Sequence, residues 1–279
     1  MIGETLYGNP MHQLLELFNN YDQILNRNFS VKDLKVPYRN INHWDEKGLL
    51  LNTKREDGQW RKFNFMDCIW IRIVTELRKF GASFALIITL KEILTEKIPF
   101  QKSDQAGDDI DYYNVLMLLL IETIITRAPI SMLLQTSGET FFYNPKQRNE
   151  YGDHYKQFIQ KPHLSLSLPY IFCQFLIEND VGLFDQKLPI ITKNEHEVLR
   201  KIRSLRISNL SVHSPLNGIT TIIHPDEDFD PKKAQKQFIL SMFSNDFEKV
   251  IYRTTDDESV EFKTQAIVHL NTASALTLD

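Results

Sequence analysis

A short segment between Pro37 and Gly48 constrains this chain more than any other feature of its sequence. Proline suits the first turn of a helix and glycine suits its left-handed end, so the segment predicts a helix of about ten residues. In that helix Ile41 and Trp44 lie three residues apart and face a core, which leaves the opposite side polar. The polar residues of the segment are Tyr38, Arg39, Asn40, Asn42 and His43. A helix of this length fits the major groove of DNA, where the donors and acceptors of Asn and Arg match base edges.

The next feature along the chain is a basic hairpin. Asp57 and Gly58 predict a two-residue turn, and Trp60 and Phe63 after it are expected to pack against the helices. We therefore expect Trp44 and Trp60 to have structural roles. The cations of the hairpin, which would point toward a polyanion, are Lys54, Arg55, Arg61 and Lys62.

A long helix follows the hairpin, with Asn64 as its expected N-terminal cap and Gly81 at its end. A further apolar helix is expected from residue 84 to about 96, before Pro99 stops it. The segment 31–80 holds eleven Lys or Arg against seven Asp or Glu, a net charge of +4, whereas the whole chain carries −4. The remainder therefore carries −8, and the positive potential is concentrated in this segment.

Four short motifs follow one another here: His43-Trp44-Asp45, Gly48-Leu49-Leu50, Trp60-Arg61-Lys62-Phe63 and Leu77-Arg78-Lys79-Phe80-Gly81. In this order they resemble the MerR-type family of bacterial transcription regulators. The resemblance implies a MerR-like winged helix-turn-helix over residues 29–100 that binds double-stranded DNA. It also implies that Arg39 and His43 contact DNA from the recognition helix, and that Arg61 grips phosphate from the wing. The chain departs from the family at Asn42, where Arg is usual, and at Lys35, where Gly is usual.

The chain as a whole predicts an α+β protein that is mostly α, in which the winged helix-turn-helix is followed by one or two small α+β units. We expect four parts: an N-terminal amphipathic helix in 1–28, the DNA-binding domain in 29–100, a middle α+β domain in 101–190 and a C-terminal α+β unit in 191–279. The polar stretch 101–109 is the expected linker.

The middle and C-terminal parts carry local patterns of their own. In the middle part these predict a helix over 111–126, a hairpin from 130–134 to 140–143, a strand over 164–168 and a helix over 170–178. In the C-terminal part they predict helices over 194–204 and 233–243, an acidic loop over 225–231 and a hairpin from 250–254 to 260–263. The last helix and hairpin are either a second winged-helix-like module or a small packing unit without nucleic acid, and we prefer the packing unit.

The sequence argues against an enzyme, a cofactor site and a metal site. The eight histidines show no paired spacing with Cys, Asp or Glu, and loop composition explains both Asp153-His154 and His224 beside the acidic residues 226–230. Neither a phosphate-binding Gly-rich loop nor a nucleophile elbow is present. The aromatic residues 141–143 are expected in the core rather than in a ligand pocket. Cys68 and Cys173 lie far apart and predict buried, reduced thiols.

The longest apolar run, 115–125, is too short to span a membrane and contains Glu122. With no signal peptide, we expect a cytoplasmic, nucleoid-associated protein. The favoured function is sequence-specific binding of double-stranded DNA by a MerR-like transcriptional regulator. Two alternatives stay open: an architectural or recombination/excision accessory protein of a mobile element, and a protein-assembly module. The sequence is compatible with a homodimer and with another protein partner.

Overall fold

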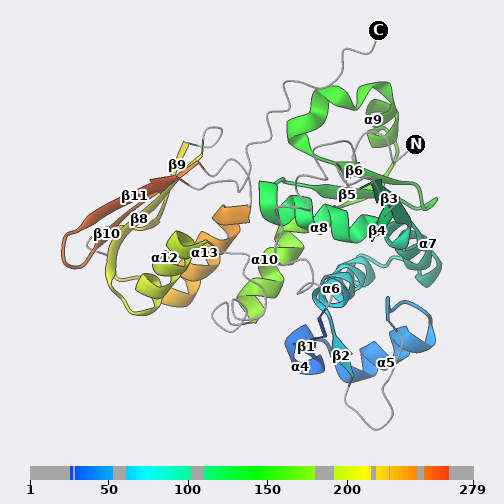
Figure 1. Ribbon diagram of the computed structural model, residues 1–279, viewed down its shortest axis with the longest axis horizontal. Helices are drawn as coiled ribbons and strands as arrows, with labels where there is room; N and C mark the ends of the chain where they lie inside the picture. Colours follow the sequence, from blue (N-terminus) through cyan, green and yellow to red (C-terminus); the bar gives the residue numbers. More distant parts are fainter. Residues whose placement is uncertain are drawn as a thin grey trace.

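The computed structural model describes residues 26–27, 29–52, 61–101, 110–179, 192–214, 218–225, 227–243 and 248–263. Within this part of the chain helices outweigh strands, and the strands form four small antiparallel sheets. The expectation of a mostly helical α+β protein is confirmed (Figure 1). The helix expected within 1–28 and the hairpin turn at 57–58 lie outside the described residues.

The N-terminal unit consists, in its described residues, of β1 (Phe29–Ser30), α4 (Val31–Leu34), α5 (Tyr38–Glu46), β2 (Lys62–Phe63), α6 (Phe65–Lys79) and α7 (Phe84–Thr95). β1 pairs with β2, which ties the start of the unit to the strand that leads into α6. Asn64 caps α6 as predicted: its side chain accepts a hydrogen bond from the Asp67 N–H at 2.8 Å. The Asp67 carboxylate accepts one from the Asn64 N–H at 3.0 Å. These reciprocal bonds satisfy two N–H groups that the helix itself leaves without partners.

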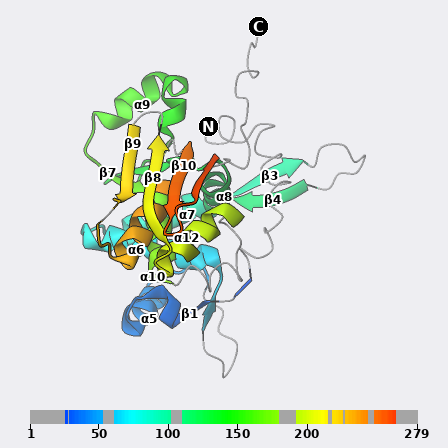
Figure 2. The same cartoon turned by 90° about the vertical axis from the view of Figure 1, so that its left-hand side faces the viewer.

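A hairpin of β3 (Lys97–Gln101) and β4 (Ile110–Asn114) follows, and then the apolar helix α8 (Val115–Thr126). Figure 2 shows this hairpin projecting from the rest of the protein. The domain boundary expected between 100 and 101 therefore falls inside a pair of hydrogen-bonded strands. The helix expected from residue 111 begins only at Val115, because Asn114 ends the strand and its side chain accepts a hydrogen bond from the Met117 N–H at 2.8 Å.

The middle sheet has β5 (Ser131–Gln135) between β6 (Thr140–Tyr143) and β7 (His163–Ser167), so the predicted hairpin and the predicted alternating strand are confirmed. The elements η1 (Pro145–Glu150) and α9 (Gly152–Ile159) connect β6 to β7, and α10 (Leu168–Glu178) follows. Phe142 lies in the core as expected, while Phe141 and Tyr143 are half-buried against aromatic side chains that include Tyr155. Residues 153 and 154, expected in a loop, lie in α9.

The C-terminal unit contains α12 (Lys193–Arg203), β8 (Ile207–Ser214), β9 (Gly218–Ile223), α13 (Pro231–Phe243), β10 (Lys249–Thr254) and β11 (Ser259–Lys263). Its strands form one sheet in the order β11-β10-β8-β9. In Figures 1 and 2, α12 and α13 cover the side of this sheet that faces the rest of the protein. The predicted hairpin is thus one edge of a four-stranded sheet.

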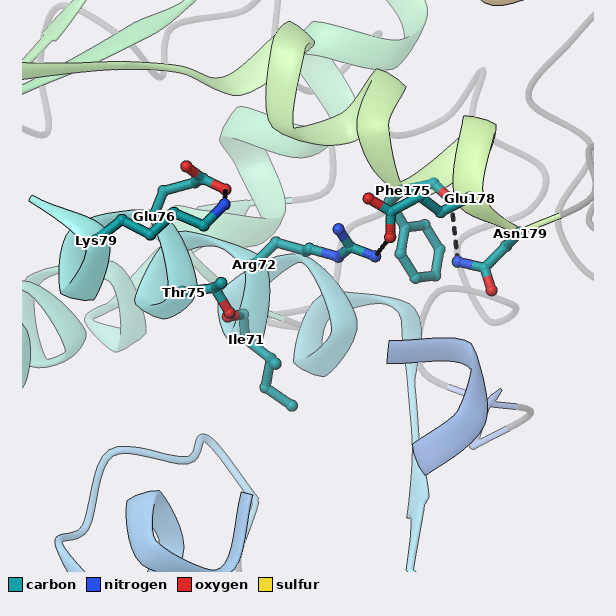
Figure 3. Close-up of polar contacts among 8 residues, drawn as sticks. All are labelled: Ile71, Arg72, Thr75, Glu76, Lys79, Phe175, Glu178 and Asn179. Atoms are coloured by element: carbon teal, nitrogen blue, oxygen red, sulfur yellow. Dashed lines mark hydrogen bonds and ion pairs between the residues drawn. The ribbon is translucent and has the colours of Figure 1, made fainter. Parts of the chain in front are cut away.

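The helix α6 packs against α10 from the middle unit. The ring of Phe65 meets those of Phe172 and Phe175 edge to face, with centroids 5.8 and 5.9 Å away. Figure 3 shows the polar part of this contact, in which the Arg72 guanidinium donates to the Glu178 carboxylate beside the Phe175 ring. The N-terminal unit consequently shares a continuous apolar core with the middle unit.

A second junction joins α8 and α10 to the C-terminal unit. The Arg127 guanidinium lies 3.8 Å from the centroid of the Phe243 ring and 3.2 Å from the carboxylate of Glu195 in α12. Cys173 on α10 is buried and free, and its thiol donates to the Ile239 carbonyl at 3.6 Å. Burial raises the pKa of Cys173 to about 12, which keeps the thiol protonated. Within the described residues, no helix combines the length and the apolar content that a membrane span requires.

Candidate nucleic-acid interface

The helix α5 carries the residues predicted to contact DNA. It begins after Pro37 and ends at Glu46, and Gly48 follows at φ +72°, a conformation that favours glycine. Ile41 is fully buried and Trp44 is only 6% exposed, so the apolar side docks as predicted. The structural role expected for Trp44 fits this burial, whereas Trp60 lies outside the described residues. In Figure 1, α5 lies at the lower edge of the protein.

A tight turn sets the direction of α5 relative to the short helix α4. The Asp33 carboxylate accepts hydrogen bonds from the Ser30 N–H and hydroxyl at 2.7 and 2.9 Å, which closes the start of α4. Lys35 then adopts the left-handed conformation, with φ 53° and ψ 28°, and the chain turns into α5. Position 35 therefore requires the backbone geometry that glycine adopts most readily, although a lysine occupies it.

Two hydrogen bonds fix the end of α5 to the helices behind it. The indole N–H of Trp70 on α6 donates to the Leu49 carbonyl at 2.6 Å. The Lys91 ammonium on α7 donates to the Gly48 carbonyl at 2.8 Å, and burial lowers the pKa of Lys91. Because these carbonyls belong to the turn that ends α5, they have no partner within the helix. The position of α5 is therefore set by α6 and α7.

Aromatic contacts hold the outer side of the same helix. The His43 ring meets the Phe84 ring edge to face, with centroids 5.5 Å apart. The Arg78 guanidinium lies 4.5 Å from the Phe84 ring centroid and donates to the Ala82 carbonyl at 2.5 Å. The ring of Phe84 on α7 thus orients His43, which stays exposed to solvent.

An ion pair joins α5 to the strand β2. The Arg61 Nη2 donates to the Asp45 Oδ2 at 2.5 Å, and the side chains of Arg61 and Asp45 are 4% and 16% exposed. The contact lies beside the β1–β2 pair, which is the base of the expected wing. It links α5 directly to that base.

A model of a known protein family matches this part of the chain. The model of the MerR HTH family regulatory proteins matches residues 31–92, from the start of α4 into α7. This segment is a MerR-type helix-turn-helix domain. No curated protein and no solved structure matched the chain.

Most of the predicted contact residues that can be placed lie on the outer surface of the MerR-type domain. Tyr38, Arg39, His43 and Lys62 are exposed, and Asn40 and Asn42 are half-buried. Lys54 and Arg55 lie outside the described residues. Arg61 is buried and paired with Asp45, which also gives it a role inside the domain; its contact with a phosphate stays a prediction. Its charge is visible in the sequence, but its burial is a consequence of the fold.

The structure also shows exposed charged residues of the MerR-type domain that are not among the predicted contact residues. They are Lys32, Lys35, Glu46 and Lys47, all on or beside α4 and α5. The position of Glu46 follows from the same spacing that placed Ile41 and Trp44 inward, so the helical pattern contained the signal for this residue. No group of His, Cys, Asp and Glu suited to a metal ion occurs in the described parts of the chain.

Proposed function

We propose that the MerR-type domain binds double-stranded DNA in a sequence-specific manner through α5, and that the protein acts as a regulator of transcription without catalysing a reaction. One observation supports the proposal: α5 exposes polar side chains while Ile41 and Trp44 are buried, and four separate contacts hold the helix and the turn after it. With its side chains an α-helix is about 10–12 Å in diameter, which fits a major groove about 12 Å wide. The nine residues of α5 span about 13.5 Å along its axis.

The polar residues of α5 suit distinct parts of the duplex. Arg39 is exposed and carries the paired donors that match guanine. Asn42, three residues further along, carries the donor and acceptor that match adenine. Tyr38, Asn40 and His43 flank them and would contact phosphates or bases. Lys62, with Lys54 and Arg55, would neutralise phosphates from the wing.

The test is selection of binding sites from genomic fragments with the purified full chain, followed by affinity measurements over a range of salt. We expect a defined sequence preference and a log K that falls steeply with log salt. Asn42→Ala should relax the preference at one base pair and leave the others, because it removes a base contact rather than a phosphate contact.

Arg206→Ala is the matched control, since Arg206 is an exposed cation of the C-terminal unit and this change should alter neither the preference nor the fold. A chain that binds all duplexes equally at every salt concentration would overturn the sequence-specific function. A chain that binds no duplex would overturn DNA binding itself.

A further inference from the structure

The outer face of α5 contains a carboxylate that the proposed function leaves without a role. Arg39, Asn42, His43 and Glu46 follow at intervals of three, one and three residues, so they form one line along the helix opposite Ile41 and Trp44. Glu46 is exposed at the end of this line. A protein surface that approaches a polyanion usually excludes carboxylates, because each one is repelled by the phosphates.

The position of Glu46 is also unfavourable within the protein. It is the last residue of α5, where the negative end of the helix dipole disfavours an anion. It forms no ion pair with any described residue, in contrast to its neighbour Asp45, which is paired with Arg61. Within the described residues, neither ion pairing nor the helix dipole favours a glutamate at this position.

We propose that Glu46 is a specificity-determining residue, which accepts a hydrogen bond from the amino group of a cytosine in the major groove. The inference rests on the proposed function. A carboxylate offers acceptors only, and cytosine N4 is the donor with which Glu pairs in the major groove. Guanine and thymine present acceptors at the corresponding positions, so the carboxylate discriminates against them by repulsion as well as by the missing bond.

The geometry of α5 gives the place of this cytosine. Glu46 lies seven residues after Arg39, which corresponds to about 10.5 Å along the helix axis. Base pairs are stacked about 3.4 Å apart, so the cytosine should lie about three base pairs from the base that Arg39 contacts. Both side chains then lie within one stretch of the major groove.

The experiment is parallel selection of binding sites with the full-length wild type, Glu46→Ala and Glu46→Gln. For the wild type we expect a cytosine at one position. Glu46→Ala should lower the discrimination at that position by about 5- to 150-fold while raising affinity for unrelated duplexes. Glu46→Gln should move the preference at the same position to adenine, because glutamine presents a donor and an acceptor together.

Glu258→Gln is the control, because it removes the same charge from an exposed turn in the C-terminal unit, and it should leave the preference unchanged. Both Glu46 variants should retain their melting temperature, since they remove an anion from the end of a helix. Identical preferences for wild type and Glu46→Ala, or a wild-type preference for another base at the affected position, would overturn the role of Glu46 alone. A wild type without any sequence preference would overturn the proposed function and this inference together.

Discussion

Replacing Arg61 with alanine separates two roles for this side chain, a phosphate contact and an internal anchor. The guanidinium is 2.5 Å from the Asp45 carboxylate, in a pair whose side chains are 4% and 16% exposed. Removing one partner of a buried ion pair costs about 3–5 kcal/mol. We expect the lower end, about 3 kcal/mol, for two reasons. Asp45 keeps some contact with water, and Nε and Nη1 of Arg61 are buried without hydrogen-bond partners among the described residues.

Urea unfolding followed by tryptophan fluorescence measures this loss selectively. The three tryptophans, Trp44, Trp60 and Trp70, all lie within the matched segment 31–92, so their fluorescence reports the unfolding of the MerR-type domain. The neighbouring cation Lys62 is exposed, and Lys62→Ala should change the free energy of unfolding by no more than about 0.5 kcal/mol. The double variant Asp45→Leu with Arg61→Met should recover much of the stability, because it leaves no buried charge behind.

Titration of DNA binding with salt completes the test. If Arg61 is an internal anchor and contacts no phosphate, Arg61→Ala should leave the slope of log K against log salt unchanged. A phosphate contact would instead flatten the slope by about 0.9 and leave the urea midpoint where it was. That second pattern would refute the internal role of Arg61.

Three further predictions follow from single positions. Lys35→Gly should raise the free energy of unfolding by about 0.5–1 kcal/mol in the same fluorescence assay, because it relieves the left-handed conformation of a non-glycine residue; a loss of stability would contradict this. Lys62→Glu should flatten the salt slope of DNA binding by about 0.9 with an unchanged melting temperature, and an unaltered slope would remove Lys62 from the interface. Burial raises the pKa of Glu122 from 4.5 to about 7, so the folded state binds the proton of this carboxyl group more tightly than the unfolded state does. The free energy of unfolding therefore falls as the pH rises from about 4.5 to about 7. Unfolding at pH 5 and pH 8 should show a smaller fall for Glu122→Gln than for the wild type, and equal falls would exclude Glu122 as its source.

Local signals predicted the elements that local interactions form. Pro37 and Gly48 bounded α5 correctly, and Asn64 marked the start of α6, because caps and turns depend on residues within a few positions. The start of α8 was placed four residues too early, since β4 exists only through its pairing with β3. A pairing across the segment 102–109 leaves no local pattern in the sequence.

The sequence predicted only part of the candidate site, because contacts between residues far apart along the chain leave no local pattern. Helical spacing fixes which side chains of α5 face outward, and so it identified Arg39 and His43. Helical spacing cannot predict the ion pair between Arg61 and Asp45, because the two residues lie sixteen positions apart along the chain. Glu46 is not among the expected contacts because a basic segment predicts contacts by cations, although the spacing places its carboxylate on the same line.

The helix α6 contacts both α5 and α10, so residues outside the matched segment 31–92 also support the position of α5. Residues 68–71 of α6 are all buried, which requires cover on both sides of the helix. On one side, the Trp70 indole holds the end of α5 through the Leu49 carbonyl. On the other, Phe172 and Phe175 of α10 pack against Phe65, and Glu178 pairs with Arg72. The two contacts thus share α6, which packs against α10 on one side and holds the end of α5 on the other.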